Sequence, residues 1–257
     1  MPALPPAFLG APIAHRALHD RAAGRPENSR AAVRAAVAAG YGIEIDIQPS
    51  ADGVPMVFHD DDLARLTGQS GRIRDVTAER LAALPLLGGD EGVPTLAEVL
   101  SIVAGRVPLL IEVKDQDGAM GPNVGPLERR VAEVLAGYSG PVAVMSFNPH
   151  SVAALAQAAP AVPRGLTTWE WAPKEAAEEG VDAATCARLR GIPDYDRVGA
   201  TFLSHHHRDL ARPRVAELKA AGAAVLCWTI RSAEDEAAAR AVAQNITFEG
   251  YAAAIPA

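Results

Sequence analysis

Acidic and cationic side chains stand beside apolar, strand-like runs at several points in the first half of this chain. Glu44 and Asp46 alternate with isoleucines in the segment 43–47, and Glu112 and Lys114 end a second apolar run. Residues two apart on a strand share one face, so Glu44 would lie beside Asp46 and Glu112 beside Lys114. Three carboxylates with a nearby ammonium could hold a divalent cation and a phosphate.

The three carboxylates need a cation if they share one space. Buried carboxylates repel each other, and one of their pKa values rises unless positive charge lies between them. Oxygen ligands suit Mg²⁺ or Ca²⁺ better than Zn²⁺, which favours histidine and cysteine. A divalent cation with Arg16 and Lys114 sets four positive charges against three carboxylates and one phosphodiester charge. This balance predicts an obligatory metal, because unneutralised charge in a partly dry cleft is costly.

Two histidines and an arginine could complete such a site. His15 ends the apolar run 10–14, and Arg16 follows it directly. A guanidinium can bind two phosphate oxygens at once, and two imidazoles can supply the acid and the base for hydrolysis of a phosphodiester. Each histidine alone could be a hydrogen-bonded core residue. Because both would lie beside the acids, we expect His15 and His59 to be catalytic.

A hairpin is expected to bring His59 to the acidic strand. Asp52-Gly53 separates two extended runs, which is a strong hairpin signal, and the gap is too short for a helical crossover. A two-residue turn would pair Ala51 with Val54 and would place His59 opposite Asp46.

Structural interpretations compete with these functional ones. The acids could form a surface salt-bridge set and Lys114 an ion pair at a rim, although carboxylates flanked by isoleucine and valine are difficult to solvate. Asp60–Asp62 are expected to cap a helix and form a solvated turn, with orientation of His59 by Asp60 as the functional alternative. Trp228 is expected to be partly core and partly substrate wall.

Five motifs occur in this order: His15-Arg16-Ala17, Pro26-Glu27-Asn28-Ser29, Glu44-Ile45-Asp46, His59-Asp60 and Glu112-Val113-Lys114. No single motif is specific, but the ordered set resembles the glycerophosphodiester phosphodiesterase family. The resemblance implies a TIM-type barrel and metal-dependent cleavage of glycerophosphodiesters to glycerol 3-phosphate and an alcohol. It also implies that the three carboxylates are metal ligands and that the two histidines are acid and base.

Three features depart from the family pattern. Ala17 replaces the glycine that follows His-Arg, and Glu249 stands near the C-terminus where the family tends to have an aspartate. His205–His207 match no family motif. Three contiguous histidines cannot all bind one metal comfortably, and we expect them to be exposed in a loop at the active face. The departures leave the catalytic groups intact but put the alcohol preference in question.

Strand-like and helix-like segments alternate along the chain, which predicts an α/β fold of the TIM-type (β/α)8 class. The barrel strands are expected to end at 14 and to cover 43–47, 109–113, 142–145, 165–168, 201–203, 225–230 and 246–248. Helices are expected at 30–39, 78–84, 96–104, 127–135, 149–158, 176–189, 212–221 and 233–242. The segment 48–94 would be a hairpin-containing insertion after the second barrel strand, forming a cap. The active face of such barrels lies at the C-terminal strand ends, where His15, Asp46, Glu112 and Trp228 fall.

Composition agrees with this architecture. A chain of 257 residues, 49% hydrophobic and 21% charged, can bury one large core, so a single domain over 1–257 is expected. A net charge of −7 without a basic run argues against nucleic acids and anionic membranes as partners. The sequence has no apolar run of membrane-spanning length, and Cys186 and Cys227 show no disulfide or metal spacing. A cytoplasmic enzyme with a small-molecule substrate, without stable membrane association, is therefore expected.

Two other functions are compatible with the sequence. A phosphodiesterase of the phospholipase D or C type, acting on lysolipids, could use the same barrel. A non-catalytic phosphate-binding protein agrees less well, because a binder needs no proton donors. The sequence leaves open the alcohol moiety, the choice between Mg²⁺ and Ca²⁺, which histidine is the acid, and the oligomeric state.

Overall fold

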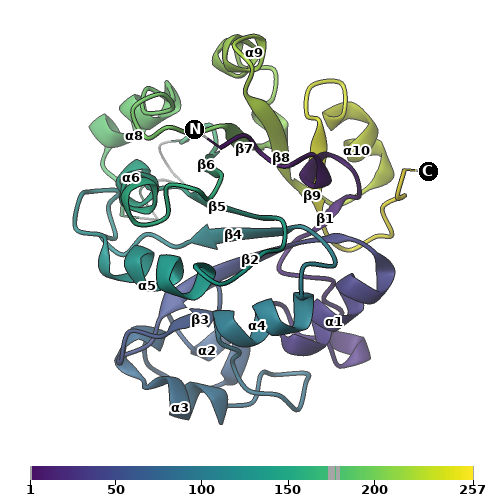
Figure 1. Ribbon diagram of the computed structural model, residues 1–257, viewed down its shortest axis with the longest axis vertical. Coiled ribbons are helices and arrows are strands. Elements are labelled where there is room, and N and C mark those ends of the chain that lie inside the picture. The colour runs from purple at the N-terminus through teal and green to yellow at the C-terminus, as the bar shows by residue number, and fades with distance from the viewer. Residues whose placement is uncertain (1, 173–176, 178–179, 257) are drawn as a thin grey trace.

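The computed structural model describes residues 2–172, 177 and 180–256. Within them, eight parallel strands close into a barrel that is surrounded by helices (Figure 1). The strands are β1 (Ile13–Ala14), β2 (Gly42–Pro49), β4 (Leu109–Val113), β5 (Val142–Ser146), β6 (Arg164–Thr168), β7 (Phe202–His206), β8 (Ala224–Ile230) and β9 (Asn245–Phe248). Each pairs with the next in this list, and β9 pairs with β1 to close the barrel. The predicted TIM-type fold is confirmed.

The helices between the strands occupy most of the predicted positions. They are α1 (Arg30–Ala39), α4 (Leu96–Val103), α5 (Pro126–Leu135), α6 (Pro149–Ala158), α8 (Ala183–Arg190), α9 (Pro213–Ala220) and α10 (Ala233–Ala239). Helix α1 begins after Ser29, whose side chain accepts a hydrogen bond from the Ala32 N–H, and ends at Gly40 with φ of 79°. The helix predicted at 176–189 corresponds to α8 in its second half, and residues 176 and 178–179 lie outside the described residues. Helix α10 ends three residues before the predicted 242.

The strand β2 shows how the alternating sequence positions the acids. Its isoleucines belong to the large apolar cluster that also contains residues of α1 and α4, so this face packs against the helices. Glu44 and Asp46 alternate with them and therefore point into the barrel. The same alternation in β4 packs Ile111 and Val113 outward and directs Glu112 inward. Apolar burial on the outer face thus fixes the direction of the carboxylates.

An additional segment between β2 and α4 forms a small unit beside the barrel. It contains β3 (Pro55–Val57), α2 (Ala64–Thr67) and α3 (Ala78–Ala82); in Figure 1, β3 is next to β2 and α3 is farther from the barrel. It has an apolar cluster of its own, formed by Met56, Phe58, Leu63, Leu66, Ile73, Leu81, Leu86 and Val93. The role of this segment as a cap stays a prediction.

The hairpin register differs by one residue from the predicted one. Ile47 pairs with Val57, and the Phe58 N–H donates to the Asp46 carbonyl at 2.9 Å, so Phe58 rather than His59 stands opposite Asp46. The physical reason is the loop, which closes at Ser50 and Val54 around three residues and not two. Gly53 supplies the left-handed φ of 75° that such a three-residue loop requires. His59 consequently lies one position beyond the end of the pairing.

Candidate active site

Three inward-facing carboxylates meet near the C-terminal ends of β2 and β4. One oxygen each of Glu44, Asp46 and Glu112 lies within 4.8 Å of the others, and Asp46 stands opposite Glu112 in the sheet. All three side chains are buried. The structure therefore brings the whole predicted ligand set together. Its all-oxygen chemistry fits a hard divalent cation such as Mg²⁺ or Ca²⁺.

Lys114 neutralises two of these carboxylates. Its Nζ lies 2.8 Å from Oδ1 of Asp46 and 2.5 Å from Oε1 of Glu112. Burial would raise the pKa of Asp46, but Lys114, His59 and Arg16 hold that pKa well below its usual range. Burial alone would lower the pKa of Lys114, but Asp46 and Glu112 raise it above its usual range. The charged pair Lys114–Asp46 is thus stable inside the barrel mouth.

Glu44 is the least neutralised member of the cluster. It accepts a hydrogen bond from the Arg16 backbone N–H at 2.8 Å. Burial, followed by repulsion from Asp46 and Glu112, raises the pKa of Glu44 well above its usual range. A further cation near Glu44 would offset both its burial and this repulsion. The electrostatics of the cluster therefore fit a metal ion.

His15 follows β1 and is held by a carboxylate from the far end of the chain. Its Nδ1 lies 2.6 Å from Oε2 of Glu249, directly after β9. His19 Nε2 lies 3.4 Å from the same oxygen, and Arg231 pairs with the other carboxylate oxygen at 2.7 Å. Burial lowers the pKa of His15 although the hydrogen bond to Glu249 acts in the opposite direction. Because Nδ1 is engaged, Nε2 is the nitrogen that can face a substrate.

Sequence reasoning identified both His15 and Glu249 but missed the contact between them and the neighbouring His19. The signal was available, because closing an eight-stranded barrel pairs the last strand with the first, and β9 does pair with β1. The residues that follow these two strands must then lie side by side at the active face.

Glu249→Gln should lower kcat by at least about tenfold with little change in KM, because His15 loses the acceptor that fixes its ring orientation. Steady-state kinetics on a glycerophosphodiester would measure the two constants separately. Glu249→Asp should recover part of the loss, and Glu217→Gln on the outer helix α9 is the matched control. An unchanged kcat in Glu249→Gln would contradict the assigned role.

His59 is anchored by a chain of charged groups. Its Nδ1 lies 2.7 Å from Oδ1 of Asp60. Arg65 on α2 donates to Asp60 at 2.6 Å and to both oxygens of Glu27 at 2.7 and 2.8 Å. Glu27 in turn accepts from Arg16 at 2.8 Å. Charge-assisted hydrogen bonds thus connect His59, on the additional segment, to Arg16, after β1.

The expected capping role of Asp60 is wrong. Helix α2 has Leu63 at its N-cap position, without a side-chain capping bond. Asp60 instead contacts His59, which was the functional alternative. The reason is that the Asp60 carboxylate is engaged by Arg65, which donates to both of its oxygens.

The loop after β1 holds three residues in the left-handed region. Arg16, Ala17 and Asn28 have φ of 50°, 64° and 58°. Asn28 tolerates this conformation and donates through Nδ2 to Oδ2 of Asp46 at 2.9 Å. Ala17 adopts the conformation that a glycine would take freely, at a cost of about 1 kcal/mol. The backbone path is therefore compatible with alanine, and the Ala17 N–H still donates to the Glu44 carbonyl.

The histidine triplet is not an exposed loop, so this prediction is wrong. Strand β7 extends to His206 because both of its neighbours continue the pairing, Thr168 with His205 and Trp228 with His206. His205 is fully buried, and its Nδ1 lies 2.7 Å from Oγ1 of Thr168. His206 and His207 are half-buried.

Aromatic rings line the other half of the barrel mouth. The Trp228 ring lies 5.5 Å from the Phe147 ring and 5.1 Å from the His206 ring, measured between centroids. Phe147 follows β5 and Trp228 lies on β8. Two strands, β6 and β7, separate β5 from β8 in the sheet, so the contact between the two rings crosses the mouth. Trp171 is buried against Phe147 and Trp169.

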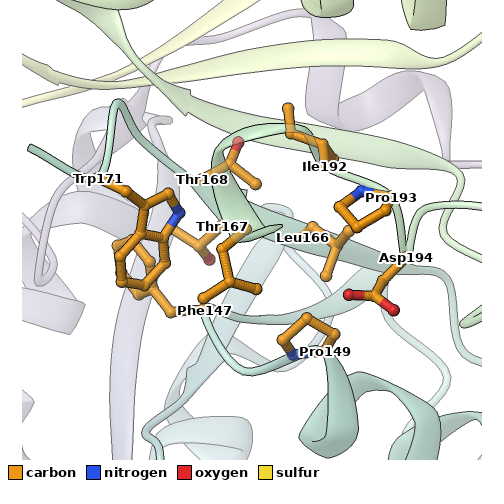
Figure 2. A pocket seen from close by; sticks show the side chains of 10 residues that line it. Phe147, Pro149, Leu166, Thr167, Thr168, Trp171, Ile192, Pro193 and Asp194 are labelled. Atoms are coloured by element: carbon orange, nitrogen blue, oxygen red, sulfur yellow. The ribbon is translucent and has the colours of Figure 1, made fainter. Parts of the chain in front are cut away.

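A small crevice lies behind these rings. Figure 2 shows Phe147 and Trp171 at one end and Leu166, Ile192 and Pro193 at the other. Its volume of about 10 Å³ has room for little more than one water. It is therefore no substrate site.

Comparison with known proteins identifies the family. Residues 15–246 match the model of the glycerophosphoryl diester phosphodiesterase family. The chain belongs to this family. The Bacillus subtilis protein YhdW is 27% identical over 240 residues, which are 90% of each chain. A glycerophosphodiester phosphodiesterase of Caldanaerobacter subterraneus is 30% identical over 151 residues, 55% of this chain and 60% of that protein.

Solved structures of family members have the same fold. A phosphodiesterase of Oleispira antarctica, in complex with the product sn-glycerol-3-phosphate, is similar with a TM-score of 0.76 and 25% identity over 95% of this chain and 94% of that chain. A Thermotoga maritima glycerophosphodiester phosphodiesterase has a TM-score of 0.69 at 20% identity, covering 93% and 94%. The family resemblance predicted from the five sequence motifs is confirmed. This member of the glycerophosphoryl diester phosphodiesterase family is an enzyme.

Proposed function

We propose that this enzyme hydrolyses glycerophosphodiesters to glycerol 3-phosphate and an alcohol, with a divalent cation held by Glu44, Asp46 and Glu112. The observation that carries the proposal is the buried carboxylate cluster. Two histidines lie at the same barrel mouth, and each is held by a carboxylate outside the cluster. Family membership and the product bound to the Oleispira antarctica relative support the reaction.

The cation would neutralise the phosphate and polarise its oxygens as a Lewis acid. The oxygen-only donor set supports Mg²⁺ or Ca²⁺. The incompletely neutralised Glu44 supports a cation at this position.

Arg16 and Lys114 would bind the phosphate. Arg16 Nε is buried without a hydrogen-bond partner among the described residues, although it lies 3.7 Å from Asp46 Oδ2. A buried donor without a partner is costly, so an oxygen of the substrate would satisfy it. Trp228 would form the wall of the site beside the phosphate.

His15 and His59 would transfer the two protons through Nε2. One would accept a proton from the nucleophile, which is water or the glycerol 2-hydroxyl, and the other would donate one to the departing alkoxide. Glu249 and Asp60 contact Nδ1 of the two rings and so leave both Nε2 atoms for this task. We assign His59 as the acid.

Arg16→Lys and Lys114→Ala should each lower kcat/KM for glycerophosphocholine by roughly tenfold or more. Lysine keeps the charge of Arg16 but loses the two-pronged donor, and alanine at 114 removes a charged contact. Initial-rate kinetics would measure the effect, with Lys219→Ala on α9 as the matched control. Wild-type kcat/KM in either site variant would show that the phosphate contacts are misassigned.

Product analysis by phosphorus NMR tests the proposed reaction. Glycerophosphocholine, glycerophosphoethanolamine and glycerophosphoglycerol, incubated with enzyme and Mg²⁺ or Ca²⁺, should all yield glycerol 3-phosphate. Phosphocholine as the product would indicate the phospholipase C type of cleavage. Cleavage of lysophosphatidylcholine alone would favour the phospholipase D alternative, and intact substrates would support a binding protein.

No helix in the described part of the chain is long and apolar enough to cross a membrane. Both cysteines are free and buried. A single domain over 1–257 and a cytoplasmic location stay predictions.

A further inference from the structure

The rim beyond Trp228 carries polar groups that the proposed reaction does not use. Glu170, two residues after the end of β6, places Oε2 2.7 Å from Nδ1 of His206. The side chains of Glu170 and His206 are 34% and 21% exposed, so a ligand can reach both.

The backbone of Glu170 is fixed independently of its side chain. Arg190 on α8 donates to the Glu170 carbonyl at 2.8 Å and to the Trp171 carbonyl at 2.6 Å. Trp171 is itself buried. The carboxylate is therefore held at the rim by His206 on one side and by an anchored backbone on the other.

Aromatic faces adjoin this carboxylate. The His206 ring, which Glu170 contacts, lies 5.1 Å from the half-buried Trp228 ring and 5.3 Å from the His207 ring. Glu170 is thus linked to the Trp228 indole through the His206 ring. A carboxylate and an indole at one rim can attract an ammonium group, the first through its charge and the second through the ring quadrupole.

The strand order connects this rim to the reacting centre. Trp228 lies on β8, which pairs with β9, and Glu249 after β9 holds His15. Phe147, which contacts Trp228 across the mouth, follows β5, and β5 pairs with the strand that carries Glu112. A phosphodiester at the carboxylates would thus have the Phe147–Trp228 wall beside it, with Glu170 and His206 beyond.

We propose that Glu170, His206 and Trp228 form an alcohol subsite that selects glycerophosphodiesters whose alcohol carries an ammonium group, such as choline or ethanolamine. This inference rests on the proposed function and adds the alcohol preference to it. It also gives a role to His206, which no family motif accounts for.

The test compares two esters of equal shape. Glycerophosphocholine carries a quaternary ammonium, and the glycerophosphoryl ester of 3,3-dimethylbutanol has a carbon in its place. The wild-type ratio of kcat/KM for the charged over the neutral ester should be about tenfold. Glu170→Gln should lower the ratio clearly below the wild-type value, and the part contributed by the Trp228 ring should remain. Glu79→Gln, which removes an exposed carboxylate from α3, should keep the wild-type ratio.

Each outcome decides the proposal. A wild-type ratio near one would overturn it without any variant, and so would a Glu170→Gln enzyme that is folded by circular dichroism and keeps the wild-type ratio. Hydrolysis of both esters at equal rates would leave the proposed function intact and refute only the subsite. Absence of glycerol 3-phosphate from either ester would refute the function and, with it, the subsite.

Discussion

His59→Ala should slow hydrolysis of glycerophosphocholine by about 10²–10⁴-fold and slow hydrolysis of a glycerol nitrophenyl phosphate much less. Choline leaves as a strongly basic alkoxide and needs a proton in the transition state, whereas nitrophenolate is stable without one. His15→Ala should slow both substrates by similar factors, because a base acts on the nucleophile whatever group departs. Turnover rates of the two variants on the two substrates give the four values required.

The control for this comparison is His150→Ala on α6, which removes an imidazole that has no assigned role in the site. If His59→Ala and His15→Ala lose the same factor on both substrates, neither histidine is a dedicated general acid. The leaving oxygen would then be stabilised by the cation or by Lys114. If only His15→Ala discriminates between the substrates, the two assignments must be exchanged.

Glu44→Gln and Asp46→Asn should each raise the concentration of Mg²⁺ or Ca²⁺ that gives half-maximal activity by at least about tenfold. Both substitutions keep the shape of the side chain and one carbonyl oxygen but remove the negative charge. The Glu44→Gln variant should keep its fold. In the metal-free protein Asp46 and Glu112 repel the charge of Glu44, so removing that charge relieves the repulsion. Metal titrations of activity would measure the shift.

Glu128→Gln is the matched control for a buried carboxylate. Glu128 is fully buried and accepts hydrogen bonds from the Ser151 hydroxyl and the Gly125 N–H, outside the cluster. Its substitution should affect stability but not the metal requirement. An unchanged metal requirement in both cluster variants would contradict their assignment as ligands.

The strands were predictable because their faces differ so strongly in polarity. Isoleucine and valine alternate with carboxylates in β2 and β4, and only one direction buries the former against helices. The barrel then requires the acids to meet at one end, so the carboxylate cluster could be predicted from the residues alone. Local periodicity was sufficient to predict a strand wherever its apolar side chains and its acidic side chains lie on opposite faces.

The errors arose where the outcome depends on contacts that local sequence does not encode. Asp52-Gly53 fits loops of two or three residues, and the hydrogen bond between Ser50 and Val54 selects the longer one. His205 is polar and so resembles a loop residue, but it is fully buried, and Thr168 on the neighbouring strand satisfies its ring. The link from Arg65 to Glu27 joins residues 38 positions apart, and no periodicity indicates it.

The central claim is that a metal ion at the buried carboxylates is required for cleavage. The enzyme should be treated exhaustively with a chelator, shown by elemental analysis to be metal-free, and assayed on glycerophosphocholine by phosphorus NMR. We predict that formation of glycerol 3-phosphate stops and that Mg²⁺ or Ca²⁺ restores it. Full activity of the verified metal-free enzyme would contradict the account.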